Sequence, residues 1–250
     1  MNKLSTLIFD VDGTLAETER DGHRIAFNLA FKAAKLDWEW DVSLYGKLIE
    51  VAGGKERIGF YIREYQPHFQ PPLPLDEFIA QLHQAKTQHY QQVLAQNAIP
   101  LRPGVKRLLE EARFKGIKLA IASTAAYPNV LALLENSFNK DAVSWFKVIA
   151  AGDIVSAKKP APDIYHYVLE QMNLSPAECL VFEDSHQGLT AATQAGLKTV
   201  VTINDYTKDQ DFTKATLVLN HLGEPDLPFT VIAGDARDKT YLDITLAQFL

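Results

Sequence analysis

The chain has 250 residues, 47% of them hydrophobic and 22% charged, which is the balance of an ordinary globular protein with a substantial core. Its formal net charge of −6 provides no basic surface for nucleic acid. No apolar run approaches the roughly 18 residues that span a membrane, and the single cysteine, Cys179, excludes an internal disulfide framework. The sequence therefore predicts a soluble intracellular protein that binds neither nucleic acid nor membrane.

Short apolar segments alternate with amphipathic ones along most of the chain. The predicted strands, in order, are Leu4–Phe9, Ile117–Ala122, Val148–Ala150, Cys179–Glu183 and Thr199–Ile203. The predicted helices are Pro103–Lys115, Pro128–Phe138, Ala161–Met172 and His186–Ala195. The strands alternate poorly between apolar and polar residues, as is typical of strands covered on both faces. This pattern predicts an α/β fold with a doubly wound, Rossmann-like parallel sheet.

One segment interrupts the alternation. Residues 19–97 contain helical patterns, a proline-rich interruption at Gln66–Pro74 and no convincing strand. We therefore expect an all-helical domain over residues 19–97, inserted into a core domain made of residues 1–18 plus 98–250. Beyond Asp205 the pattern is ambiguous, with a possible edge strand at Leu217–Leu219 and a loop at Gly223–Pro228.

Polar residues stand where four of the predicted strands end. The four groups, in chain order, are Asp10 and Asp12, Ser123 and Thr124, Lys159, and Glu183 and Asp184. A single pair of acids is weak support for a site, because acids also cap helices. Parallel strands end at one edge of a sheet, however, and open α/β sheets bind ligands there. All four groups together predict one site at that edge.

The carboxylates of this site repel one another, by about 4 kcal/mol per pair at 4 Å and an effective dielectric constant near 20. A Mg²⁺ ion removes that conflict and leaves coordination positions for a phosphate. We expect Asp10 and Asp184 as direct ligands and Glu183 as a ligand that binds directly or through water. Lys159 would neutralise a bound phosphoryl group, and the neighbouring Ser and Thr hydroxyls would donate hydrogen bonds to it.

The segments DVDGT, KPAPD and FEDS, with the Ser/Thr end of the second strand, resemble the four motifs of the haloacid dehalogenase superfamily of phosphohydrolases. The resemblance implies that Asp10 attacks phosphorus and becomes an aspartyl phosphate. It implies that Asp12 protonates the leaving oxygen and then acts as a base, with its main-chain carbonyl as a third Mg²⁺ ligand. Ser123 and Lys159 would complete the catalytic group, and the helical insertion would be a mobile cap that determines specificity.

The segment Gly53-Gly54-Lys55-Glu56-Arg57 combines two glycines at a predicted helix start with two basic side chains. Open backbone N–H groups together with Lys55 and Arg57 would cradle a second phosphate. The alternative is a glycine-rich turn followed by a solvated charged face. The spacing alone leaves both interpretations open.

The segments ETERDGHRIAFN and WDVSLYGKLIEVAGGKERI resemble CbbY-type sugar-bisphosphate phosphatases, with most likeness to the plant and cyanobacterial branch. These enzymes remove the 1-phosphate of xylulose 1,5-bisphosphate, an inhibitor of Rubisco. We expect a monomer in the cytoplasm, or in the plastid stroma if this is a processed plant chain. The implied contacts to the sugar and its distal phosphate are Glu17, His23, Arg24, Gly53, Gly54, Lys55, Arg57, Thr124 and Asn129.

Two other enzymatic functions remain open at this point. A phosphomutase of the β-phosphoglucomutase type shares the nucleophile, and a phosphatase of another small ester such as phosphoglycolate shares the whole core site. A non-catalytic phosphate-binding module is disfavoured by the presence of Asp10, Asp12, Lys159 and Asp184 together. Away from the site, Cys179 is expected in the core, and Trp38 and Trp40 in the packing of the cap.

Overall fold

The computed structural model describes residues 4–51, 53–96, 99–138 and 140–250. The chain forms two compact units, Met1–Glu17 with Pro100–Leu250, and Thr18–Ile99. We call them the sheet unit and the helical unit. The sequence predicts that the helical domain ends between residues 97 and 98, and these two residues lie outside the described part of the chain.

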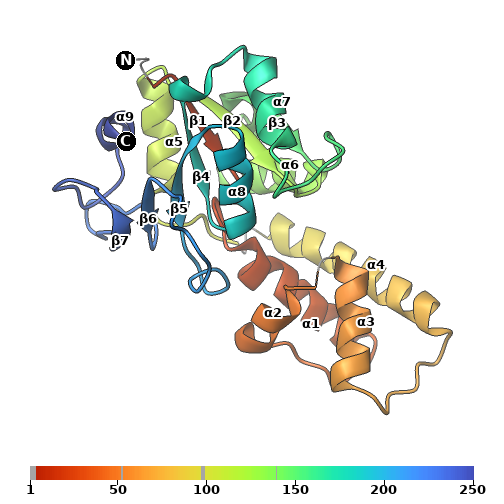
Figure 1. Cartoon of the computed structure of the whole chain (residues 1–250). Coiled ribbons are helices and arrows are strands. Elements are labelled where there is room, and N and C mark those ends of the chain that lie inside the picture. Colours follow the sequence, from red (N-terminus) through yellow and green to blue (C-terminus); the bar gives the residue numbers. More distant parts are fainter. Residues whose placement is uncertain (1–3, 52, 97–98, 139) are drawn as a thin grey trace. The chain divides into compact units, whose positions relative to one another are not determined.

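The sheet unit is built on a seven-stranded sheet in the order β3-β2-β1-β4-β5-β6-β7 (Figure 1). The strands are β1 Thr6–Phe9, β2 Lys118–Ser123, β3 Phe146–Ala151, β4 Cys179–Glu183, β5 Lys198–Thr202, β6 Leu217–Leu219 and β7 Val231–Gly234. In this order, every pair of neighbouring strands is parallel except the last, because β7 runs antiparallel to β6. The predicted parallel α/β fold is confirmed.

The edge of the sheet differs from the prediction. Leu217–Leu219 is a strand, but β7 pairs with it on the outside, so it is not the edge strand. All four residues of β7 are exposed, with Val231 at 42% and Ile232 at 49%. A strand that buries none of its side chains carries no pattern of buried and exposed residues, which explains why the sequence did not indicate β7.

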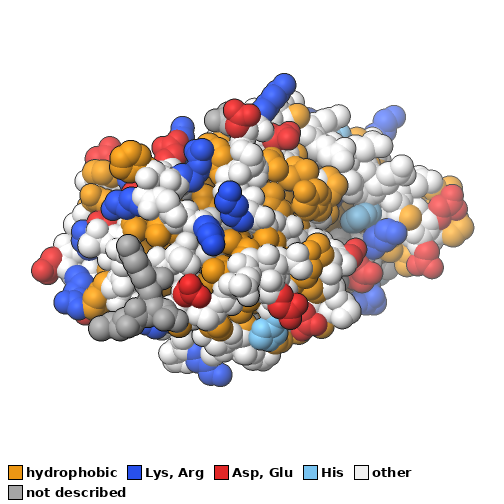
Figure 2. All heavy atoms as spheres, turned by 90° about the horizontal axis from the view of Figure 1, so that it is seen from above, with side chains coloured by type: hydrophobic (Ala, Val, Ile, Leu, Met, Phe, Trp, Pro, Cys, Tyr) orange, Lys and Arg blue, Asp and Glu red, His pale blue; other side chains and the backbone are white. Residues whose placement is uncertain are grey.

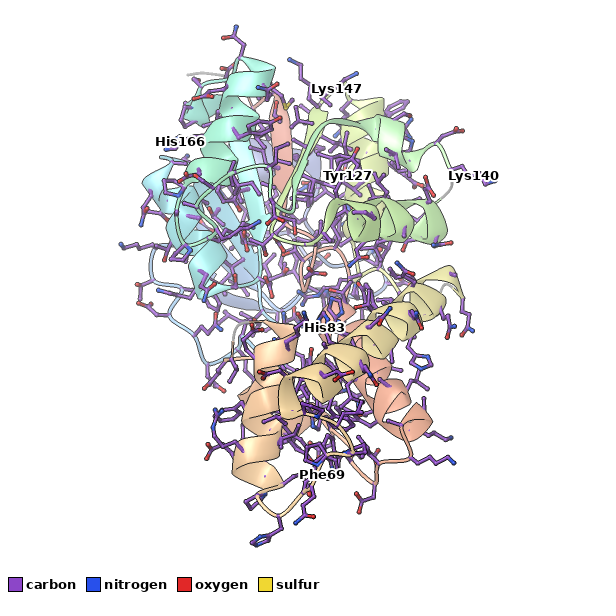
Figure 3. All side chains as sticks on the ribbon, turned by 90° about the vertical axis from the view of Figure 1, so that its right-hand side faces the viewer. Phe69, His83, Tyr127, Lys140, Lys147 and His166 are labelled. Carbon is purple, nitrogen blue, oxygen red and sulfur yellow. The ribbon has the colours of Figure 1, made fainter. Side chains whose placement is uncertain are left out.

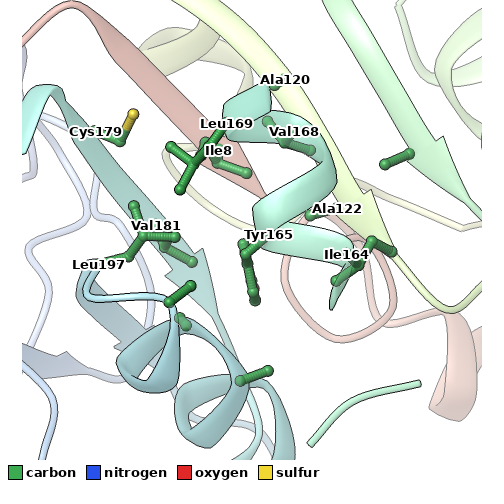
Figure 4. Packing of buried hydrophobic residues seen from close by; sticks show 14 residues of the cluster. Ile8, Ala120, Ala122, Ile164, Tyr165, Val168, Leu169, Cys179, Val181 and Leu197 are labelled. Atoms are coloured by element: carbon green, nitrogen blue, oxygen red, sulfur yellow. The ribbon is translucent and has the colours of Figure 1, made fainter. Parts of the chain in front are cut away.

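Helices cover both faces of the sheet. The register aligns Ile8 of β1 with Ala120 of β2 and Val181 of β4, and all three are fully buried. They belong to a cluster that α7 and α8 cover, shown in Figure 4. Cys179 is part of this cluster and is a free thiol, as predicted. The helices of this unit are α5 Val105–Phe114, α6 Tyr127–Ser137, α7 Asp163–Met172, α8 His186–Gln194 and α9 Ile244–Phe249, with the 3₁₀ turns η2 Ala142–Trp145 and η3 Pro176–Glu178.

The helical unit contains no strand among its described residues. Its elements are the π-helical turn η1 Thr18–His23 and the helices α1 Arg24–Ala33, α2 Val42–Leu48, α3 Gly54–Tyr65 and α4 Leu75–Ala95. The proline-rich segment lies between α3 and α4, as predicted. Trp38 and Trp40 are buried, and each packs against the rings of Phe31 and Tyr61. Their predicted role in packing is confirmed.

The two chain segments that leave and re-enter the sheet unit are paired. Ala16 and Leu101 form an antiparallel bridge, and the amide of Arg102 donates to the carbonyl of Leu15 at 2.9 Å. On the molecular face in Figure 2, acidic and basic side chains are interspersed, in keeping with the absence of a basic field. Within the described residues, no helix is both long and apolar enough to cross a membrane.

Candidate active site

Three carboxylates converge where β1 and β4 end. These neighbouring parallel strands align Phe9 with Phe182, so Asp10 comes to lie beside Glu183 and Asp184. One ligand oxygen from each acid lies within 4.8 Å of the others. The residues are almost fully buried, with exposed fractions of 7% for Asp10, 1% for Glu183 and 7% for Asp184. We refer to them as the acidic trio.

Lys159 joins the acidic trio from the loop beyond β3. Its ammonium donates to Oδ1 of Asp10 at 2.7 Å and Oε1 of Glu183 at 2.5 Å. The third bond goes to the carbonyl of Ala122 at 2.8 Å, which ties the loop to β2. Burial acts to lower the pKa of Lys159, but the two carboxylates outweigh it and raise that pKa above its ordinary value. The lysine is therefore a permanent positive charge.

One lysine does not balance three buried carboxylates. Burial raises the pKa of Asp10 to about 7, while Lys159 opposes the rise and Glu183 adds to it. Burial, Asp10 and Glu183 raise the pKa of Asp184 well above its usual value, against the stabilising effect of Arg102 and Asn204. The trio thus resists full ionisation without a further positive charge.

The donor set suits a hard divalent cation. All of the converging atoms are carboxylate oxygens, the ligands that Mg²⁺ prefers. The backbone also leaves room beside them, because Gly13 has φ +83° and a Cβ atom built on it would overlap Oδ2 of Asp184. These residues therefore fit the predicted Mg²⁺ ion.

Two residues that the sequence did not single out hold the trio in place. The hydroxyl of Tyr165 donates to Oε1 of Glu183 at 2.6 Å, and the amide of Asn204 donates to Oδ2 of Asp184 at 2.7 Å. Asn204 follows a fifth strand end, so extending the comparison of strand ends to β5 would have found it. Tyr165 lies on the apolar face of α7 and carries no such signal.

The remaining predicted residues of the sheet unit lie around β2 and the turn after β1. Ser123 ends β2, is 1% exposed, and accepts a hydrogen bond from the amide of Ala125 at 3.2 Å. Thr124 is exposed and Asn129 is half-buried in the first turn of α6. In the described part of the chain, no hydrogen bond joins either of them to the acidic trio. Asp12 is half-buried, two residues beyond Asp10.

Glu17 forms an ion pair within the sheet unit. Its Oε1 lies 2.9 Å from Nε of Arg102, and the exposed fractions of the two side chains are 15% and 5%. The sequence predicts Glu17 as a substrate contact, and the structure adds this buried arginine as its partner.

A second charged group lies inside the helical unit. The hydroxyl of Tyr45 donates to Oε2 of Glu19 at 2.5 Å and accepts from the Arg57 guanidinium at 2.9 Å. Nearby, Nζ of Lys86 lies 2.8 Å from Nδ1 of His23. We call these five side chains the basic group.

The basic group carries a net positive charge. Burial, assisted by Lys86 and Arg57, lowers the pKa of His23 to about 3, so its neutral ring accepts a hydrogen bond from Lys86. Burial acts to raise the pKa of Glu19, but the surrounding basic groups and the Tyr45 hydroxyl lower it below its usual value. Two cations, Arg57 and Lys86, thus accompany one carboxylate, which favours an anion.

The glycine-rich segment begins α3, as the sequence predicts. Gly53 is its N-cap with φ +92°, and Gly54 packs against His83 of α4, which Figure 3 labels. Lys55 is exposed, as a solvated face requires. Arg57, in contrast, is buried: it is 8% exposed and donates to the carbonyl of Leu48 at 3.1 Å.

Arg24, another predicted substrate contact, is bonded to the backbone. Its guanidinium donates to the carbonyls of Arg20 at 3.1 Å and Trp40 at 3.2 Å. These bonds fix the start of α1 against the segment before α2.

Comparison with known proteins identifies the family. The family model of haloacid dehalogenase-like hydrolases matches residues 4–196. The chain belongs to the haloacid dehalogenase-like hydrolases. Among these hydrolases it is 47% identical to the protein CbbY of Rhodobacter capsulatus, over 85% of this chain and 91% of that protein. It is 41% identical to a CBBY-like protein of Arabidopsis thaliana, over 88% of this chain and 70% of the relative.

A solved structure agrees with these matches. The crystal structure of a CbbY variant from Rhodobacter sphaeroides in complex with xylulose 1,5-bisphosphate is 43% identical, with a TM-score of 0.73, and covers 87% of this chain and 94% of its own. The hydrolase is therefore a CbbY-like phosphatase. The identities do not favour the plant relative over the bacterial one, so the plant and cyanobacterial branch stays a prediction.

Proposed function

We propose that this phosphatase is Mg²⁺-dependent and converts xylulose 1,5-bisphosphate to xylulose 5-phosphate and inorganic phosphate. The acidic trio with Lys159 carries the proposal, because it combines a metal-binding donor set with a fixed positive charge beside Asp10. The choice of sugar is supported by the 43% identical CbbY structure that holds this bisphosphate.

In the proposed reaction, a carboxylate oxygen of Asp10 attacks phosphorus as the bond from phosphorus to the sugar oxygen breaks. Asp12 donates a proton to that leaving oxygen, and Asp10 becomes an aspartyl phosphate. Asp12 then takes a proton from a water molecule, whose oxygen attacks phosphorus, releases phosphate and restores the Asp10 carboxylate. Two easier displacements thereby replace one difficult hydrolysis.

The charges of the site support this sequence of steps. Lys159 favours the ionised form of Asp10, since its ammonium opposes the rise in the Asp10 pKa that burial causes, and a bound cation would complete that effect. Mg²⁺, held by Asp10, Asp184 and the main-chain carbonyl of Asp12, with Glu183 direct or through water, would neutralise the phosphoryl oxygens. Ser123 and Thr124 would donate hydrogen bonds to the same oxygens.

The basic group of the helical unit would bind the distal phosphate. Its two cations outnumber its one carboxylate, so the group can bind a second phosphate. A monophosphate ester has no such phosphate and would not use this charge. The backbone at Gly53 and Gly54, with Lys55, would extend this subsite. Glu17, His23, Arg24 and Asn129 are proposed as contacts to the sugar. We also propose that the enzyme acts as a monomer in the cytoplasm, or in the plastid stroma of a plant.

Phosphate release with Mg²⁺ tests the proposal on a panel of substrates. We expect strong preference for xylulose 1,5-bisphosphate over ribulose 1,5-bisphosphate, phosphoglycolate and p-nitrophenyl phosphate, and loss of turnover after chelation of the metal. Asp10→Asn should abolish release because an amide is a poor nucleophile. Conversion of β-glucose 1-phosphate to glucose 6-phosphate, with little free phosphate, would instead identify a mutase.

A further inference from the structure

Arg102 is a buried arginine at the point where the chain re-enters the sheet unit. It is 6% exposed. Its Nε pairs with Glu17 at 2.9 Å. Nη1 donates to the carbonyls of Gly13 and, at 2.9 Å, Thr202. Nη2 donates to the carbonyls of Ile203 and, at 2.8 Å, Asn220. All five N–H donors of the guanidinium therefore have an acceptor.

This arrangement depends on the shape of arginine. A guanidinium presents five donors in one rigid plane, and here they meet one carboxylate and four carbonyls, and the carbonyls come from three segments of the chain. A lysine ammonium has three donors on one atom and reaches fewer of these acceptors. The buried charge is balanced by Glu17, so the pair costs less to bury than the arginine alone.

Three of the four carbonyl acceptors belong to two segments that lie next to the acidic trio. Gly13 belongs to the turn directly after Asp12, and its amide donates to Ala16 at 2.8 Å, which fixes the peptide unit whose carbonyl is that of Asp12. In the other segment, Thr202 and Ile203 precede Asn204, whose amide holds Asp184 at 2.7 Å.

We propose that Arg102 is a positioning residue of the active site, which locks the turn after Asp12 to the end of β5 and so fixes the position of that turn relative to the segment that holds Asp184. The proposal rests on the proposed function only for its kinetic consequence. Its effect on metal binding follows from the contacts of Arg102 alone. Arg102 reaches no reacting atom and acts through Gly13, Glu17 and the Asn204 segment.

Arg107 provides a matched control. It also links distant parts of the sheet unit, because it ties α5 to the chain beyond β6 through an ion pair with Glu224 at 3.0 Å, a bond to the carbonyl of Gly223 at 2.8 Å and stacking on Tyr241. None of these partners belongs to the turn after Asp12 or holds a member of the trio. Loss of Arg107 should therefore lower stability without changing the metal site.

The test compares Arg102→Lys, Arg102→Met and Arg107→Met in the full chain. Mg²⁺ affinity is measured by titration calorimetry without substrate, Tm by thermal unfolding, and kcat and KM on p-nitrophenyl phosphate. We expect the Mg²⁺ Kd to rise about tenfold or more in Arg102→Met and less in Arg102→Lys, because groups that orient metal ligands typically contribute that much. The expected kinetic change is a lower kcat at saturating Mg²⁺ with little change in KM. Arg107→Met should lower Tm with an unchanged Kd.

Wild-type Mg²⁺ affinity and kcat in folded Arg102→Lys, with only a lower Tm, would overturn the proposal and leave Arg102 as scaffold. If Arg102→Met does not fold, Arg102→Lys alone tests the proposal, because lysine keeps the positive charge and lacks the planar set of five donors. A wild-type enzyme that hydrolyses none of the proposed substrates would refute the proposed function. The calorimetric comparison would still decide the role of Arg102.

Discussion

Gly13 shows how closely the backbone approaches the acidic trio. It combines a positive φ of +83° with a position where a Cβ atom would overlap Asp184 and lie 2.7 Å from Nδ2 of Asn204. An alanine there introduces two separate costs, the strain of a left-handed backbone and the displacement of a carboxylate. A control that carries only the first cost separates them.

Gly13→Ala should therefore weaken Mg²⁺ binding and phosphate release at least tenfold, the scale typical of disturbed support around metal ligands. The control is Gly116→Ala, since Gly116 has φ +72° and a Cβ atom added to it would meet nothing within 4 Å. It should lose stability by about 1–2 kcal/mol and keep its Mg²⁺ affinity. Equal Mg²⁺ dissociation constants for the two variants would show that the close approach at Gly13 is unimportant.

His23 should make the stability of the protein depend on pH. Its pKa is lowered from 6.5 to about 3 by burial and by Lys86 and Arg57, against the effect of Glu19, with His83 also facing it. Between these two pKa values, His23 binds a proton in the unfolded chain and does not bind one in the folded chain. The free energy of unfolding is therefore undiminished above about pH 6.5 and falls as the pH drops toward 3.

Urea unfolding at pH 7.5 and pH 5 measures this dependence. We expect the loss of stability at pH 5 to be smaller in His23→Gln than in the wild type, because glutamine does not titrate. His68→Gln, which changes an exposed histidine of the same unit, should keep the wild-type difference. An identical loss in His23→Gln and the wild type would contradict the assignment of a neutral His23 in the folded protein.

At the scale of elements, α2 links two neighbours through one hydroxyl. Tyr45 of α2 is fully buried and bridges Glu19 of η1 and Arg57 of α3. The Arg57 guanidinium also lies over the Tyr45 ring, 5.2 Å from its centroid. The hydroxyl thus sets the angle of the guanidinium, while the ring supports its position.

Tyr45→Phe removes the hydroxyl and keeps the ring. We expect KM for xylulose 1,5-bisphosphate to rise about tenfold or more, the equivalent of one lost hydrogen bond to a charged group, and KM for p-nitrophenyl phosphate to stay unchanged. Tyr61→Phe is the control, because the Tyr61 hydroxyl accepts a hydrogen bond from the Gln66 amide at 3.2 Å and lies outside the basic group. A similar rise for both substrates would make Tyr45 a packing residue only.

The sequence predicted those elements that show a periodic pattern of apolar residues and those residues that stand at the end of a predicted strand. Strands β1 and β4 are buried along their whole length and consist mostly of apolar residues, and the acids at their ends stand out because they interrupt those runs. Arg57 illustrates the limit. Its charge suggested either phosphate binding or solvent exposure, and its burial against the carbonyl of Leu48 in α2 depends on contacts between elements.

At the scale of the whole molecule, the same limit applies to residues that act across long stretches of chain. Arg102 meets acceptors up to 118 positions away, and Tyr165 meets Glu183 from a helix that also builds the core. No local pattern marks either one, because the partner set exists only once the sheet has formed. Family and fold followed from the motifs, while the support of the metal site required the structure.

The bridge between Ala16 and Leu101 has a consequence for how such an enzyme acquires new substrates. The segments that leave and re-enter the sheet unit are held together by this bridge. The helical unit is therefore an insertion whose two ends already lie side by side. Exchanging residues 18–99 for another insertion adds little closure entropy, since that cost grows only slowly with length. The register of β1 with β2 is also left unchanged. The acidic trio and Lys159 can thus be inherited intact while the helical unit is replaced.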